Sequence, residues 1–169
     1  MNQPQQHALM KLAEELTGVS LLETGTVNPF FLLATTDQAY HIPVDFSNQQ
    51  QKEFTSVKIA AILQAKDCDH YSFVTRIQFP AKAGDKEVMK QQVLILFAQQ
   101  DKSASFNCVA DLYDLKLSTE LARPQLKHHQ RLEDFDGQFS NLFDAPEIPD
   151  DLMQSLIENA DSYLYQQDN

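Results

Sequence analysis

The sequence predicts a single α+β domain in which a five-stranded, mostly antiparallel sheet carries helices mainly on one face. Three observations predict this class: helical periodicity at both ends and once in the middle of the chain, an apolar run at residues 30–34, and three β-rich runs in succession between residues 70 and 115. A chain of 169 residues is of ordinary single-domain length, so residues 1–169 form one globular unit. The expected order of elements is α-β-β-α-β-β-β-α.

Two helices are predicted before residue 70. The first spans residues 4–17, where apolar side chains recur at i, i+3, i+4 and i+7 and a glycine follows at a usual helix end: Leu9, Leu12, Ala13, Leu16 and then Gly18. The second spans residues 49–66, with Ser47 and Gln50 as a capping box. Its expected buried stripe contains Phe54, Val57, Ala61 and Ala65, with Ile62 beside it.

Five strands are predicted, at residues 30–35, 39–46, 70–79, 91–98 and 105–115. The runs at 30–35 and 92–98 are the most apolar and are expected in internal strands. Pro43 assigns the second strand to an edge of the sheet, because proline cannot donate to a neighbouring strand. Residues 80–90 are expected to form a long charged loop. Strand orders 2-1-5-4-3 and 2-1-3-4-5 both agree with this pattern.

The C-terminal third divides into an irregular acidic and aromatic segment, residues 116–149, and a helix at residues 150–165 that caps the core. Pro124, Gly137, Pro146 and Pro149 interrupt the irregular segment. Phe135, Phe139 and Phe143 recur at i, i+4 and i+8 and predict an aromatic ridge. The ridge either packs onto the sheet, which is the preferred interpretation, or faces a basic-rimmed groove of a partner.

One short stretch of this segment resembles a known class of peptide. Residues 138–143, Gln-Phe-Ser-Asn-Leu-Phe, resemble the glutamine-to-Leu-Phe peptides that bind bacterial sliding clamps. The spacing departs from the usual form of those peptides, and the resemblance covers six residues.

The net charge of −11 is concentrated near the C-terminus. Residues 1–130 carry twelve basic and fourteen acidic side chains, whereas residues 131–169 carry one basic and ten acidic. Such a field disfavours nucleic acid and anionic membranes and favours a basic protein partner. A basic cluster is expected to be neutralised by the carboxylates that follow it in the chain; it comprises Lys116, Arg123, Lys127, His128, His129 and Arg131.

Cysteine and glycine usage limits the chemistry. Cys68 and Cys108 form no disulfide framework and predict a reducing, cytoplasmic location. Cys108 is expected in the core and Cys68 in a more exposed turn. No metal site and no cofactor are predicted, because phosphate-binding and hydrolase motifs are missing and no donor set has a diagnostic spacing. Metal ligands, if present, are expected among Cys68, Asp69, His70, His128 and His129.

These observations favour a non-enzymatic interaction or accessory protein that presents an acidic surface to a partner and leave its oligomeric state open. The predicted partner-binding residues are Asp144, Glu147, Asp150 and Asp151. One alternative is a small enzyme or ligand-binding domain that uses His41 and Asp45, four residues apart on one face of a predicted strand. Another alternative is an acidic decoy that occupies a nucleic-acid-binding protein.

Overall fold

The computed structural model describes residues 3–83, 86–100, 108–118, 123–133, 135, 137, 139–144 and 147–165. The helices are α1 (Gln3–Thr24), α2 (Gln49–Ala65) and α3 (Asp150–Leu156), with two 3-10 helices, η1 (Leu142–Asp144) and η2 (Ala160–Tyr163). The strands are β1 (Phe30–Ala34), β2 (Ala39–Pro43), β3 (His70–Ala83), β4 (Lys86–Gln99), β5 (Cys108–Ser118) and β6 (Arg123–Glu133).

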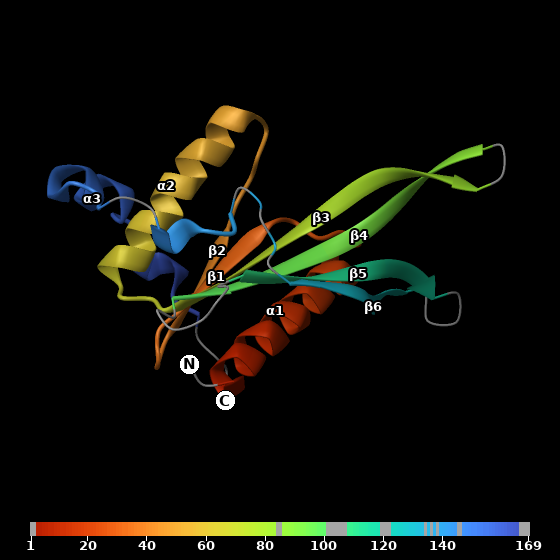
Figure 1. The fold of residues 1–169 in the computed structure, drawn as a ribbon, viewed down its shortest axis with the longest axis horizontal. Helices are drawn as coiled ribbons and strands as arrows, with labels where there is room; N and C mark the ends of the chain where they lie inside the picture. The colour runs from red at the N-terminus through yellow and green to blue at the C-terminus, as the bar shows by residue number, and fades with distance from the viewer. Residues whose placement is uncertain are drawn as a thin grey trace.

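The six described strands form one antiparallel sheet in the order β2-β1-β3-β4-β5-β6 (Figure 1). The predicted α+β class is confirmed, and residues 30–34 and 92–98 lie in internal strands. Pro43 is the last residue of β2, which is an edge strand as predicted. Because the chain returns through α2 to the free side of β1, the order 2-1-3-4-5 is selected over 2-1-5-4-3.

The strand count of five is wrong, because β6 lies inside the segment 116–149 that was predicted to be irregular. β6 pairs along its whole length with β5, with one irregularity between Leu112 and Tyr113. The strand forms the second edge of the sheet, and its residues 127–131 are exposed. An edge strand tolerates Pro124 and charged side chains, so it lacks the apolar alternation that marks a half-buried strand.

The predicted loop at residues 80–90 is also wrong. β3 and β4 pair without interruption from His70 opposite Gln99 to Ala83 opposite Lys86. The two strands form a long arm that extends well beyond the helices (Figure 1). Strand pairing, rather than an apolar pattern, carries the hairpin to this length.

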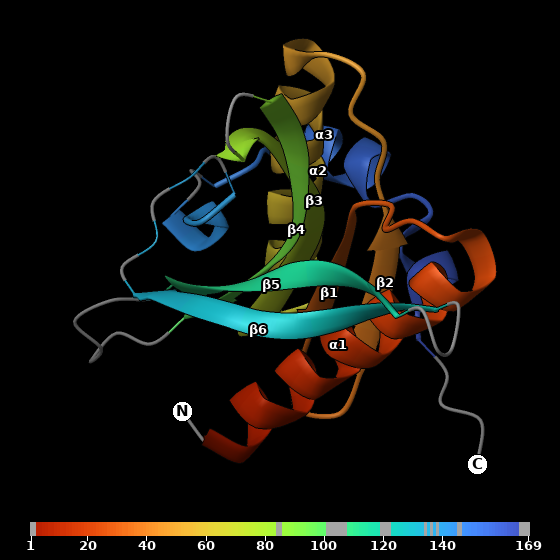
Figure 2. The ribbon, with the colours of Figure 1, turned by 90° about the vertical axis from the view of Figure 1, so that its right-hand side faces the viewer.

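Both faces of the sheet are covered. Phe31 and Leu33 belong to a core cluster with Ile59 and Ile62 of α2. The alternate side chains of β1 belong to a second cluster, which contains Leu9 of α1. In Figure 2, α1 lies below β5 and β6, whereas α2 and α3 lie above them. α2, α3 and the 3-10 helix η1 lie on one face of the sheet, and α1 forms a layer of its own on the other.

α1 continues past Gly18, where the sequence predicted its end. Gly25 follows the last helical residue with φ +74, and its N–H donates to the Leu21 carbonyl at 2.9 Å. This is the left-handed helix terminus that glycine adopts without steric cost. The second half of α1 buries Leu21 against the sheet, and this tertiary contact extends the helix through Gly18.

Alanine substitutions at Gly25 and Gly18 are expected to change stability in opposite directions. Gly25→Ala is expected to lower the free energy of unfolding by about 1 kcal/mol, because an L-residue is strained at positive φ. Gly18→Ala is expected to raise it by up to about 1 kcal/mol, because alanine is the better helix former. A Cβ at either position meets nothing within 4 Å, so packing does not enter the comparison. Urea unfolding of both variants measures the two changes in the free energy of unfolding. If both substitutions change it equally and in the same direction, α1 does not end at Gly25.

α2 begins at residue 49, as predicted, but its N-terminal cap is not the Ser47–Gln50 pair. Its N-cap is Asn48, whose side-chain oxygen accepts from the Gln51 N–H at 2.8 Å. The Gln51 side chain reaches back to Ser47, accepting from its N–H at 2.7 Å and from its hydroxyl at 2.6 Å. The reciprocal cap predicted for Ser47 and Gln50 is therefore formed by residues 47, 48 and 51.

Of the predicted apolar stripe of α2, only Ala61 and Ile62 are buried, and Ala65 at its C-terminal end is exposed. Ile59 to Leu63 are all buried, whereas Phe54 is 61% exposed and Val57 44% exposed. Ala60 and Ala61 are covered by α3 and the residues around it, which supply Ile148, Met153, Leu156 and Ile157. α3 has seven residues and leaves the N-terminal half of the stripe uncovered.

The predicted helix at residues 150–165 is interrupted. α3 ends at Leu156, η2 follows, and the chain then pairs with the free edge of β2. Leu164 forms a β-bridge with Tyr40, and the Tyr165 N–H donates to the Ala39 carbonyl at 2.8 Å. The unpaired backbone groups of an edge strand compete here with continued helix. None of the described helices is both long and apolar enough to span a membrane.

The aromatic segment folds back onto the sheet, as the preferred interpretation predicted. Phe139 is 7% exposed; its ring stacks on Phe46 with centroids 5.4 Å apart and meets the edge of Phe31 at 5.3 Å. Phe143 packs on Tyr71 at 5.2 Å. Turns and a short 3-10 helix, instead of a helical ridge, bring these rings to the core. The stretch that resembles clamp-binding peptides therefore buries two of its apolar side chains within the fold, Phe139 and Leu142.

Phe139 is expected to stabilise the fold strongly. Phe139→Ala should cost about 3 to 5 kcal/mol, the usual penalty for truncating a buried phenylalanine. Phe54→Ala is the matched control and should change stability by about 0.5 kcal/mol or less, because the ring is exposed. Chemical denaturation of the two variants tests the assignment. A Phe139→Ala variant as stable as the wild type shows that the segment does not close the core.

Candidate functional site

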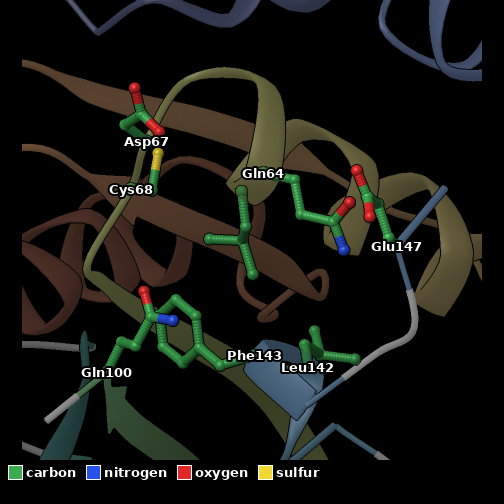
Figure 3. Close-up of a pocket in the computed structure, with 8 residues that line it drawn as sticks. Gln64, Asp67, Cys68, Gln100, Leu142, Phe143 and Glu147 are labelled. Atoms are coloured by element: carbon green, nitrogen blue, oxygen red, sulfur yellow. The ribbon is translucent and has the colours of Figure 1, made fainter. Parts of the chain in front are cut away.

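A cavity of about 460 Å³ opens where the C-terminal end of α2 meets η1 (Figure 3). Its apolar floor consists of Leu63, Leu142 and Phe143. Other side chains surround this floor, with Asp67 and Cys68 on one side and Gln64 and Glu147 on the other. Gln100 lies beside Phe143. The cavity therefore combines an apolar floor with two carboxylates that come from distant parts of the chain.

The turn after α2 places Asp67 and Cys68 at this cavity. The Cys68 N–H donates to the Leu63 carbonyl at 3.0 Å, across a residue in left-handed conformation, Asp67, at φ 52. This is the geometry of a Schellman helix terminus, in which aspartate is one of the few residues that replace glycine at modest cost. As a result the chain reverses sharply, with the Asp67 side chain exposed and the Cys68 side chain buried.

Cys68 does not have the properties of a reactive thiol. The sequence predicted an exposed turn cysteine, but the residue is buried, which corrects that prediction. Burial, together with the negative charges of Asp69 and Asp67, raises the pKa of the Cys68 thiol to about 12. The thiol is therefore protonated at neutral pH and is a poor nucleophile. Cys108 is buried, as predicted.

The floor of the cavity is held by Tyr71. Its hydroxyl donates to the Phe139 carbonyl at 2.5 Å and accepts from the Leu142 N–H at 3.2 Å. Burial raises the pKa of Tyr71 well above its ordinary value, so the hydroxyl keeps its proton. One side chain of β3 thus fixes the backbone of the segment that contributes Leu142 and Phe143 to the cavity.

The opposite rim is the segment that enters α3. The Ile148 N–H donates to the Gln64 side-chain oxygen at 3.4 Å, which joins this segment to α2. Glu147, Asp150 and Asp151 are all exposed, and the two aspartates lie in the first turn of α3. Of the four carboxylates predicted to bind a partner, only Glu147 lines the cavity, and the side chain of Asp144 lies outside the described residues.

The other predicted pair, His41 and Asp45, is not assembled as expected. β2 ends at Pro43, so Asp45 lies beyond the strand and is exposed. The His41 ring meets the edge of Phe30 at 4.9 Å, and burial lowers the pKa of His41. Within the described chain no hydrogen bond or ion pair joins the two side chains, and neither lines the cavity.

The histidines proposed as metal ligands contact carboxylates one at a time. His70 Nδ1 contacts the Asp69 carboxylate, His128 contacts Asp111, and His129 Nδ1 lies 3.4 Å from Asp114. In the part of the chain that the structure describes, no group of three or more His, Cys, Asp or Glu side chains is arranged to hold a metal ion.

Three residues of the predicted basic cluster, His128, His129 and Arg131, contact carboxylates of β5 instead of the acidic C-terminal segment. Arg131 on β6 donates two hydrogen bonds of 2.9 Å to the carboxylate of Asp111 on β5, and His128 approaches the same group at 3.1 Å. Burial opposes the charged form of Asp111, which is 2% exposed, but these hydrogen bonds and charges outweigh it and hold the pKa of Asp111 below its ordinary value. Neighbouring strands, rather than the acidic C-terminus, supply these contacts. The side chains of Lys116 and Arg123 lie outside the described residues.

This pair predicts a pH-dependent contribution to stability. Arg131→Leu should lower the free energy of unfolding by about 2 to 4 kcal/mol at pH 7, because the buried carboxylate of Asp111 loses its partner. The loss is smaller than for a fully buried pair, because the guanidinium is partly exposed. A depressed pKa stabilises the fold above the unfolded value near 3.9, and this contribution is lost as the pH falls through the lower folded value. The difference in the free energy of unfolding between the wild type and the variant should therefore shrink below about pH 3.9. A difference that stays constant from pH 7 to pH 3 contradicts the role of the Asp111 charge.

A scan against protein-family models found no match to this chain, and searches of curated proteins and of solved structures returned no significant match. The fold and the site therefore define the class by themselves: a six-stranded α+β domain with helices on both faces and an acidic-rimmed cavity at one end of α2. The sequence did not indicate this cavity, because its lining comes from five separate places: α2, the turn after it, the residue after β4, η1 and the segment that enters α3. The nearest signal was Cys68 in a turn rich in aspartate.

Proposed function

We propose that this protein is a non-enzymatic binding protein that holds a basic segment of a partner protein, with one lysine or arginine side chain inserted in the cavity at the end of α2. The observation that carries the proposal is the position of Asp67 and Glu147 on opposite sides of an apolar floor (Figure 3). A long basic side chain is the group that matches both features.

The chemistry of lysine and arginine supports this fit. Their aliphatic stems pack on apolar surface while the charged end stays near water or a carboxylate. Leu63, Leu142 and Phe143 offer the apolar surface, and the two carboxylates offer the counter-charge. A volume of about 460 Å³ admits such a side chain. Lys66, next to Asp67 in sequence, is paired with Asp161 at 2.7 Å and does not compete strongly for the cavity.

Long-range electrostatics favours the same partner. The chain has a net charge of −11, and the exposed carboxylates of Asp150 and Asp151 follow Glu147 on the segment that enters α3. A negative surface of this kind accelerates encounter with a basic partner and repels nucleic acid and anionic lipid. These carboxylates steer the partner, and the cavity selects the side chain.

The uncovered stripe of α2 supplies apolar contact beside the acidic rim. Val57 lies seven residues before Gln64, so the two side chains occupy the same side of the helix. Phe54 precedes Val57 on the exposed part of the stripe. A partner segment that carries apolar residues beside its basic residue buries the exposed stripe of α2. A segment with charged residues alone leaves this stripe in water.

The test is a selection from a random displayed peptide library against the full chain, followed by fluorescence anisotropy with the selected peptides. We expect enrichment of lysine or arginine next to apolar residues. Asp67→Asn and Glu147→Gln should each weaken binding about three- to tenfold, and the loss should decrease at high salt. Asparagine also tolerates the left-handed conformation at position 67, so the turn is retained.

Glu23→Gln on α1 is the matched control, since it removes an exposed carboxylate on the other side of the sheet and should leave affinity unchanged. Enrichment of acidic or purely apolar peptides contradicts the proposal. Equal affinity for the wild type and both cavity variants contradicts it as well.

A further inference from the structure

A second and larger cavity, of about 770 Å³, lies on the opposite face of the sheet. It is bounded by the first half of α1, the connection between β1 and β2, and Leu164 and Tyr165 near the C-terminus. His70, the first residue of β3, lines it. None of these residues belongs to the acidic-rimmed cavity.

His70 is the unusual group in this lining. It is 3% exposed, and its ring lies beside Phe97 with centroids 6.0 Å apart. Nδ1 contacts the Asp69 carboxylate, whereas Nε2 is buried and has no hydrogen-bond partner among the described residues. Buried polar atoms in folded proteins are nearly always hydrogen-bonded to protein, water or ligand. The Nε2 atom therefore lacks the contact that its position requires.

The Asp69 contact decides what that partner must be. A carboxylate accepts hydrogen bonds, so Nδ1 carries the hydrogen, and in neutral imidazole Nε2 is then an acceptor. For the neutral ring, the missing partner is therefore a hydrogen-bond donor. Thr35, another polar residue of the lining, does not supply it, because its hydroxyl donates to the Gln38 carbonyl at 3.4 Å within the β1–β2 connection.

The rest of the lining restricts the ligand further. Leu12, Ala34 and Leu164 offer apolar surface. The charged side chains are one lysine, Lys11, and two carboxylates, Glu15 and Asp37. This balance does not favour an anion, and the apolar surface does not favour a strongly hydrated cation. The lining is matched by a compact, uncharged molecule with an apolar body and a hydroxyl group.

We propose that this cavity is a binding site for a small uncharged alcohol or phenol, whose hydroxyl donates a hydrogen bond to Nε2 of His70. Asp69 acts as the positioning residue, because its carboxylate fixes the hydrogen on Nδ1. The cavity lies on the α1 face and the acidic rim on the α2 face, so this site is independent of the proposed partner site.

The test uses 4-methylphenol and 4-methylanisole, two probes of similar shape of which only the first carries a hydroxyl hydrogen. With the full chain labelled with ¹⁵N-histidine, 4-methylphenol should shift the Nε2 resonance of His70 and bind about three- to tenfold more tightly than 4-methylanisole. The 4-methylbenzoate anion should bind more weakly than 4-methylphenol. His70→Leu should remove the preference for the phenol, and His70→Gln, which keeps an acceptor, should retain part of it.

Three results overturn the proposal. They are equal affinity for the phenol and its methyl ether, binding that leaves the His70 Nε2 resonance unmoved, and an internal water on Nε2 that no phenol displaces. The wild-type measurements decide the question by themselves if His70→Leu fails to fold.

Discussion

The constraint on which this structure depends is the burial of β1 on both faces. Residues 30–33 are each 4% exposed or less, with alternate side chains in two separate core clusters. A strand of this kind requires a layer on each side. α1 supplies one layer, and α2 with the folded-back aromatic segment supplies the other. The short edge strand β2 and the long β3 flank β1 in the sheet, so the first five elements all form around four apolar residues.

The two cavities share one piece of chain, the turn between α2 and β3. Its backbone is held at both sides, because the Asp69 N–H donates to the Ala34 carbonyl at 3.1 Å and the Asp69 carbonyl accepts from the Gln100 N–H at 2.9 Å. Cys68 lines the cavity on the α2 face, and His70 lines the cavity on the α1 face. Residues on the two sides of Asp69 therefore serve opposite faces of the sheet. The left-handed conformation of Asp67 makes this sharp entry into β3 possible.

The distribution of paired charges explains where the acidic surface lies. On β5 and β6, Asp111 is buried and neutralised by Arg131 and His128. Arg131 and His128 of β6 are thereby engaged by a carboxylate of the neighbouring strand β5. Glu147, Asp150 and Asp151 remain exposed at the start of α3. The proposed binding of a basic partner rests on this separation of charge.

Local pattern was enough for the elements whose own residues determine them: the apolar run of β1, the span of α2, the edge position of the strand ending in Pro43, and the carboxylates at the start of α3. It failed wherever a distant segment decides the conformation. β6 and the outer parts of β3 and β4 are strands because of their pairing partners, and α1 passes Gly18 because Leu21 packs on the sheet. Phe54 is exposed because α3 is too short to cover it.

Both cavities combine residues from both halves of the chain, so no spacing in the sequence marks them. The sequence by itself determined the class of fold and the excess of acid at one end, since composition and periodicity are local properties. Only the tertiary structure decided which carboxylates border a cavity and which histidine is left with an unpartnered nitrogen, because both depend on contacts between segments far apart in the chain.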